Sequence, residues 1–147
     1  MSSEDLFESR GGGCACKGLK FVLGAAPLGA YACHCTDCQT LSGSAFGLAV
    51  VVRAAAFSVT GAPRLIPRRL GSGATVFRKV CPDCNVWVYG GSRLDLATPP
   101  ELVVVRAGTF DDTSWIRPQA HYWTRSKLPW VEIYPGEQIF ETQPASF

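Results

Sequence analysis

The stretch Cys33-His34-Cys35-Thr36-Asp37-Cys38 places three cysteines within six residues, and the rest of the chain is best read outward from it. Two more cysteines lie upstream in Cys14-Ala15-Cys16, and the last two lie downstream in Cys81-Pro82-Asp83-Cys84. All seven cysteines therefore belong to C-x-C or C-x-x-C clusters, which scattered thiols would not form. Because zinc prefers thiolate ligands in a tetrahedron, we predict a scaffold that holds thiolates around zinc.

Seven thiolates cannot complete two four-sulfur sites, but they divide into four plus three. Spacing alone does not say which four belong together. The most economical division gives the local trio Cys33, Cys35 and Cys38 one metal and lets the two remote pairs share another. A four-ligand site is closed and structural, whereas a three-ligand site keeps a position open, as catalytic zinc sites do.

Length and composition indicate one packed domain. The chain has 147 residues, of which 47% are apolar and 18% charged, so a disordered chain is excluded. We expect residues 1–10 to form a flexible lead-in, with glycines 11–13 bending closely around a metal, and residues 11–147 to form a single zinc domain. The net charge of +2 is too small to indicate a nucleic-acid partner.

The same composition bears on the cellular compartment. No apolar run approaches the roughly 20 residues that span a bilayer, so no membrane partner is expected. The first residues, Met1 to Asp5, are polar and acidic and do not read as a signal peptide. A cytoplasmic location follows as the expectation. In a reducing cytosol clustered cysteines are metal ligands more often than disulfides, and an odd count of seven fits disulfides badly.

Short apolar runs between glycine and proline signals recur, while helical periodicity is weak. The chain is therefore predicted to be mostly β, with antiparallel sheets and one or two short helices. One helix is expected over residues 37–41, capped by Thr36 and ended by Ser42-Gly43-Ser44. Strands are predicted over residues 19–23, 28–33, 46–52, 57–60, 75–80, 86–89, 102–107, 120–124 and 130–134.

Three ordered clusters resemble a known family. The pattern Gly13-Cys14-Ala15-Cys16, then Cys33-His34-Cys35-x-x-Cys38, then Cys81-x-x-Cys84 is similar to that of the glutathione-dependent formaldehyde-activating enzymes, also called the CENP-V/GFA domain. The stretch from Pro118 to Trp130 looks like the tail signature of that family.

The resemblance implies a mostly β, zinc-stapled fold related to the Mss4-like folds. It implies two zinc ions, a structural one on Cys14, Cys16, Cys81 and Cys84 and a catalytic one on Cys33, Cys35 and Cys38. It further implies carbon–sulfur lyase chemistry between glutathione and formaldehyde.

Two positions depart from the family pattern. Lys17 separates Cys16 from Gly18, where the family often has glycine directly after the cysteine, and Asn85 follows Cys84, where glycine is common. Asparagine tolerates a positive φ better than most residues, so we expect the second knuckle to close. Neither departure removes a ligand.

A site of three thiolates is a weak Lewis acid and suits a soft fourth ligand. A small substrate thiol fits that position, and zinc would lower its pKa and hold it as thiolate. Attack on a small aldehyde would then give an S-hydroxymethyl adduct. The alternative is a non-catalytic, zinc-stabilised binding or interaction module, for which a fourth protein ligand on that zinc would be the sign.

Other residues carry weaker expectations. His34, flanked by cysteines, is expected to point away from the metal and to hydrogen-bond locally, and His121 to be a satisfied half-buried histidine or a substrate contact. The most basic region is expected to be a solvated loop, although arginine suits the two carboxylates of glutathione; its residues are Arg64, Arg68, Arg69, Arg78 and Lys79. Three tryptophans, Trp115, Trp123 and Trp130, are expected to pack at the edge of the core.

Overall fold

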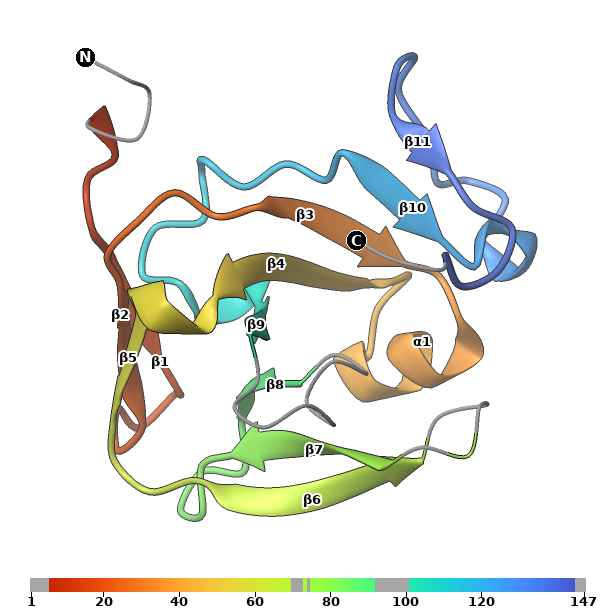
Figure 1. The fold of residues 1–147 in the computed structure, drawn as a ribbon. Coiled ribbons are helices and arrows are strands. Elements are labelled where there is room, and N and C mark those ends of the chain that lie inside the picture. The colour runs from red at the N-terminus through yellow and green to blue at the C-terminus, as the bar shows by residue number, and fades with distance from the viewer. Residues whose placement is uncertain (1–5, 70–72, 74, 92–100, 145–147) are drawn as a thin grey trace.

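In the described residues the fold consists of two β-sheets and one short α-helix (Figure 1). The computed structural model describes residues 6–69, 73, 75–91 and 101–144. The mostly β prediction is confirmed. In these residues no helix is long and apolar enough to cross a membrane.

The larger sheet has eight strands. In spatial order these strands are β11 (Gln138–Ile139), β10 (Ala120–Tyr122), β3 (Gly29–Cys33), β4 (Gly47–Arg53), β9 (Leu102–Arg106), β8 (Trp87–Gly90), β7 (Thr75–Val80) and β6 (Arg64–Arg69). Short 3-10 turns follow β4, β9 and β10 at Ala54–Ala56 (η2), Ala107–Thr109 (η4) and Thr124–Ser126 (η5). The sheet curls, so that β6 and β7 lie below β3 and β4 in Figure 1.

Strand β4 is central, as the continuous apolar run predicted. It pairs antiparallel with β3 on one side and with β9 on the other. Val50 and Val52 are fully buried, and Val51 is 2% exposed. A strand covered on both faces needs apolar residues at successive positions and not only at alternate ones.

The antiparallel prediction needs one correction. β10 pairs in parallel with both β3 and β11, with His121 opposite Ala32 and Ile139. Parallel neighbours come from distant parts of the chain, so local turn signals do not reveal them. The strand predicted at residues 130–134 is wrong: Trp130 and Tyr134 are 71% and 63% exposed and have no face to bury against.

The smaller sheet has the order β1 (Arg10–Gly13), β2 (Lys20–Leu23) and β5 (Phe57–Thr60), all antiparallel. β1 begins at Arg10, the last residue of the predicted lead-in. Glycines are poor strand formers, which hid this strand. Here Gly12 is required: a Cβ would meet the ring of Phe21, with Cε1 only 2.8 Å away, and the carbonyl oxygen of Thr109.

The main core lies between the two sheets. Phe21 and Leu23 from the small sheet, with Leu19 just before it, pack in one buried cluster with Val88 and Val105. Trp115 packs against this cluster and Trp123 against a second one around Cys33 and Cys38, as expected for the core edge. The same expectation is wrong for Trp130, which is exposed.

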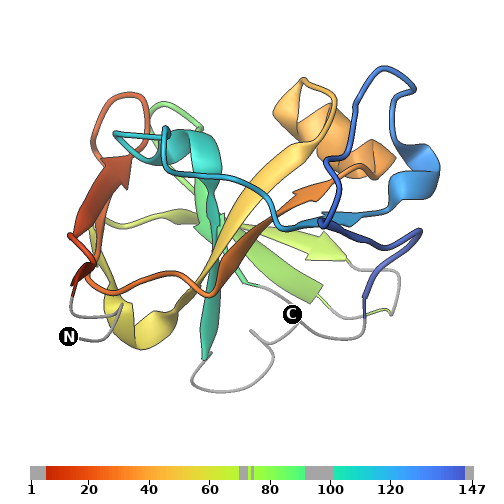
Figure 2. The same cartoon turned by 90° about the horizontal axis from the view of Figure 1, so that it is seen from above.

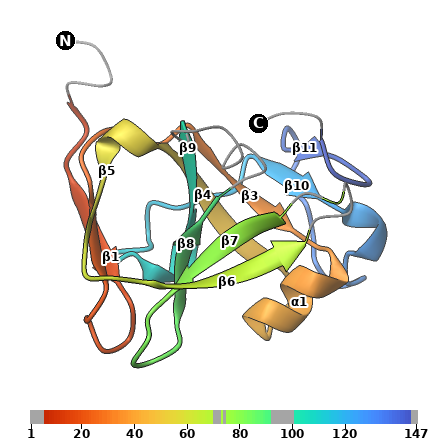
Figure 3. The same cartoon turned by 60° about the horizontal axis from the view of Figure 1, so that its bottom comes forward.

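The helix α1 (Thr36–Ser42) lies on the far side of the molecule from the small sheet, which is plain from above and from below (Figure 2, Figure 3). Its N-cap is Cys35 and not Thr36, because the Cys35 sulfur accepts the backbone N–H of Cys38. It ends at Gly43, which adopts the left-handed conformation with φ of 64°. The cap therefore belongs to a predicted metal ligand.

Candidate metal centres

Four cysteines from distant parts of the chain form one group. The Sγ atoms of Cys14, Cys16, Cys81 and Cys84 lie within 4.8 Å of one another. Cys16 Sγ is 3.7 Å from Cys14 Sγ and 3.6 Å from Cys81 Sγ. With Zn–S bonds of about 2.3 Å, the edges of a sulfur tetrahedron around zinc are about 3.8 Å long. The spacing of these sulfurs therefore fits a zinc ion.

The two halves of this group are built alike. The N–H of Cys14 donates to the carbonyl of Leu19 at 2.9 Å, and the N–H of Cys81 donates to the carbonyl of Val86 at 3.0 Å. Each turn thus closes on the residue five positions further on. Such narrow turns aim both sulfurs of a pair at one point.

Each of these turns passes through a residue with positive φ. Lys17 and Asn85 both have φ of 63°. These are the two positions at which the sequence departs from the glycine that the family favours. The expectation that Asn85 allows the second turn to close is confirmed. Lys17 adopts the same conformation, in which a side chain with a Cβ is strained.

The second group is local. The sulfurs of Cys33, Cys35 and Cys38 also lie within 4.8 Å of one another, and no other described His, Cys, Asp or Glu joins them. Cys33 ends β3 and Cys38 lies in the first turns of α1, so a strand-to-helix corner brings the three together. The backbone N–H of Cys38 reaches Cys35 Sγ at 3.3 Å. These three soft donors fit a zinc ion with a remaining coordination position.

The three sulfurs do not hold protons equally. Hydrogen bonds from Cys33 and Cys38 lower the pKa of Cys35, while the contact with Cys35 and Cys38 raises the pKa of Cys33. Cys35 is therefore the sulfur that carries negative charge first. A cation among the three removes this competition for protons.

Arginines surround this group and compensate its charge. Burial by itself lowers the pKa of Arg68, but the charge of Cys38 and a hydrogen bond to it raise the pKa above its ordinary value. Arg106 is also close to the group: a Cβ on Gly47 would be 2.7 Å from Arg106 Nη2 and 3.4 Å from the Cβ of Cys38. Burial lowers the pKa of Arg106, although the neighbouring Cys38 opposes this.

His34 does not belong to the cysteine group, and the prediction that it would hydrogen-bond locally is wrong. Its Nε2 lies 2.9 Å from Nδ1 of His121, whose Nε2 lies 3.0 Å from Oε1 of Glu137. The pKa of Glu137 is lowered by its hydrogen bonds from His121 and Tyr134 despite its burial, so its carboxylate accepts the Nε2–H of His121. His121 Nδ1 then accepts the Nε2–H of His34. Both histidines are buried, and His121 is satisfied within this chain of contacts.

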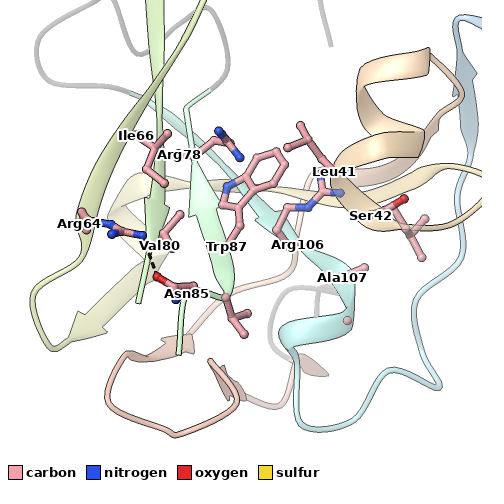
Figure 4. Close-up of a pocket in the computed structure, with 13 residues that line it drawn as sticks. Leu41, Ser42, Arg64, Ile66, Arg78, Val80, Asn85, Trp87, Arg106 and Ala107 are labelled. Carbon is pink, nitrogen blue, oxygen red and sulfur yellow. Dashed lines mark hydrogen bonds between the residues drawn. The ribbon is translucent and has the colours of Figure 1, made fainter. Parts of the chain in front are cut away.

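A cavity of about 560 Å³ opens between α1 and strands β6 to β9 (Figure 4). Its lining consists of Leu41, Ser42, Leu48, Arg64, Ile66, Arg78, Val80, Asn85, Val86, Trp87, Arg106, Ala107 and Gly108. The basic region is therefore no solvated loop: it forms the paired strands β6 and β7, and two of its arginines line a cavity. The proline at Pro67 hid β6, which lies at the edge of the sheet where proline is tolerated.

Several residues around these sites carried no sequence signal. Glu137 meets His121 only through the parallel pairing of β10 and β11. Arg106 and Trp87 lie in ordinary apolar strands. Gln39 holds α1 in place by donating from Nε2 to the carbonyls of His34 and Ser126, both at 3.0 Å. Strand alternation places Arg106 on one face of β9 but does not identify what lies across from it.

Comparisons with known proteins give a family and similar solved structures. The model of a family described as glutathione-dependent formaldehyde-activating enzyme matches residues 9–126. A crystal structure of a Rhodobacter sphaeroides protein has a TM-score of 0.49 and 19% identity, covering 88% of this chain and 98% of that chain. The search of curated proteins returned no significant match. The CENP-V part of the resemblance stays an expectation.

Proposed function

This chain belongs to the glutathione-dependent formaldehyde-activating enzyme family, whose model covers residues 9–126, and from this membership we propose that it is a zinc-dependent carbon–sulfur lyase-type enzyme. The proposed reaction joins glutathione, or a related small thiol, to formaldehyde or a related aldehyde. Its product is the S-hydroxymethyl thiol. The seven free cysteines support a reducing compartment, and we propose the cytoplasm.

One observation carries the proposal. The group of Cys33, Cys35 and Cys38 offers three ligands with no fourth among the described His, Cys, Asp and Glu residues, whereas the other group offers four. Closed four-ligand sites are structural, and sites with three protein ligands keep a position for substrate. The four-cysteine group would therefore hold the structural ion and the three-cysteine group the catalytic one.

A zinc ion on the three sulfurs would lower the pKa of a substrate thiol in the fourth position and keep it as thiolate. The thiol sulfur forms a bond to the aldehyde carbon, the C=O π bond opens, and the thiol proton ends on the oxygen. No oxidant or reductant is needed, and the reverse reaction breaks the same bond.

The residues around the three sulfurs have distinct parts in this scheme. Arg68, hydrogen-bonded to Cys38, compensates the excess negative charge of the thiolates. The N–H of Cys38 at the start of α1 does the same for Cys35. His34 is held by His121 and does not belong to the cysteine group, so its part is to fix the backbone between Cys33 and Cys35.

Calorimetric titration of the zinc-loaded protein tests the proposal. Reduced glutathione should bind saturably and oxidised glutathione, which lacks a thiol, should bind much more weakly. Formaldehyde should then give the S-hydroxymethyl product faster than the uncatalysed reaction, as followed by proton NMR. Absence of reduced glutathione binding at millimolar concentration would overturn the named reaction and favour a zinc-stabilised binding module.

A further inference from the structure

The cavity beside the three-cysteine group is strongly basic. Three guanidinium groups line it, from Arg64, Arg78 and Arg106, and no acidic residue is in its lining. In the described part of the chain none of the three forms an ion pair with a carboxylate. Like charges brought together in a concave site attract anions from solution.

The arginines are held in place before any ligand arrives. Arg64 donates from Nη2 to Oδ1 of Asn85 at 2.8 Å. The guanidinium carbons of Arg106 and Arg78 lie 4.1 and 5.5 Å from the ring centroid of Trp87 (Figure 4). Stacking on an indole keeps a guanidinium planar and fixed and leaves its N–H edge for a ligand. The fixed arrangement lowers the entropic cost of binding.

Arg78 has donor capacity that the described residues do not use. Its Nε is buried and has no hydrogen-bond partner there. The buried Nε faces the protein, so any contact with a ligand comes from the terminal N–H groups of Arg78, which lines the cavity. The planar fork of arginine matches the two oxygens of a carboxylate.

The cavity adjoins the three-cysteine group. Leu41 and Ser42, which line it, follow Cys38 on the same helix. Arg106 lines the cavity and is a neighbour of Cys38. A Cβ added at Gly47 would lie 2.7 Å from Arg106 Nη2 and 3.4 Å from the Cβ of Cys38. A molecule that extended from the cavity to the sulfurs would have a thiol near them and an acidic group among the arginines.

We propose that this cavity binds the carboxylate of the thiol substrate and thereby selects acidic thiols over neutral ones. This inference rests on the proposed function, because it takes the three-cysteine group as the place of the thiol. The cavity volume of about 560 Å³ lies within the range of roughly 300–1,000 Å³ typical of small-molecule sites. Selectivity then comes from Arg64, Arg78 and Arg106, while reactivity comes from the cysteines.

The test uses S-methylglutathione, which keeps both carboxylates but has no thiol, and its diethyl ester, which has neither carboxylate. Calorimetry with the zinc-loaded wild-type protein should show binding of the acid and at least tenfold weaker binding of the ester. Arg78→Gln should weaken binding of the acid by roughly tenfold or more. Arg53→Gln, which changes an exposed arginine at the other end of β4, is the matched control and should bind as wild type.

Measurements on the wild-type protein are sufficient to overturn the inference. Either equal binding of the acid and the ester, or no binding of the acid at millimolar concentration, would do so. Unchanged binding by a folded Arg78→Gln variant would overturn it as well. The proposed function is judged separately by 2-mercaptoethanol, a thiol without a carboxylate, which should bind the wild-type protein and the Arg78→Gln variant equally. If the wild-type protein binds S-methylglutathione but not 2-mercaptoethanol, the proposed reaction is overturned and the proposed carboxylate site in the cavity stands.

Discussion

Nε2 of His34 lies 2.9 Å from Nδ1 of His121, although the two residues are 87 positions apart. The contact is possible because β3 and β10 pair in parallel, with His121 opposite Ala32. This histidine contact connects the backbone between Cys33 and Cys35 to the C-terminal part of the chain. The three-cysteine corner is therefore local in sequence but depends on a distant strand for its rigidity.

The stability of the protein should fall as the pH drops from about 6.5 to about 4, partly through His34. Burial, together with the neighbouring His121 and Lys127, lowers the pKa of His34 to about 4 from its ordinary 6.5. The unfolded chain takes up this proton near pH 6.5 and the folded chain only near pH 4, so the free energy of unfolding rises with pH between these values. Urea unfolding at pH 7 and pH 5 measures the difference.

The matched variant for this pH effect is His34→Gln, which should show a smaller loss of stability between the two pH values. Zinc content is measured at each pH, because thiolate ligands also take up protons in acid. An unchanged pH slope in the variant, at equal zinc content, would assign the effect to other groups.

Substitutions in the two cysteine groups should have opposite consequences. Cys35→Ser should abolish thiol-dependent activity and remove one equivalent of zinc, while the melting temperature changes by only a few degrees. Cys81→Ser should lower the melting temperature by roughly 10 °C or more, because the buried Cys81 joins the N-terminal segment to the turn between β7 and β8. Differential scanning calorimetry and metal analysis measure both. Wild-type turnover by Cys35→Ser would contradict the catalytic assignment.

Gly12→Ala should destabilise the fold by about 1–3 kcal/mol, the usual cost of overpacking. The added methyl group would meet the carbonyl oxygen of Thr109 and the ring of Phe21, which is packed in the core. Gly108→Ala is the control, since a Cβ there meets nothing within 4 Å. Denaturant unfolding of the two variants should separate them clearly, and equal stabilities would contradict the packing described for β1.

Lys17→Gly should stabilise the protein by roughly 0.5–1 kcal/mol, because glycine relieves the strain of a side chain at φ of 63°. The variant loses the ion pair between Lys17 Nζ and Asp111, 3.2 Å long, but both partners are exposed and the pair contributes little. Lys17→Ala, which loses the same ion pair and keeps the Cβ, should show no gain. A gain in Lys17→Ala equal to that in Lys17→Gly would exclude backbone strain as the cause.

Much of the local structure was predictable from the sequence. The strands at 57–60 and 75–80 have the predicted bounds, and the helix after Cys35 begins within one residue of the expected position. The two strands are short apolar runs bounded by glycine or proline, which is the sequence pattern that predicts a strand without knowledge of its neighbours. β1, β6 and β11 lacked it, because glycine, proline and exposed positions make a strand only where a neighbouring strand accepts them.

The sequence by itself determined that seven cysteines fall into three tight clusters, that the chain is mostly β, and that a strand leads into a short helix at the central cluster. These properties depend on residue type and on spacing of a few positions. Only the tertiary structure decided that the pairs Cys14–Cys16 and Cys81–Cys84 form one group, that His34 meets His121, and that the arginines of three strands share a cavity beside Cys38. Those contacts are set by the register of strands far apart in the chain, and register depends on the packing of the whole core.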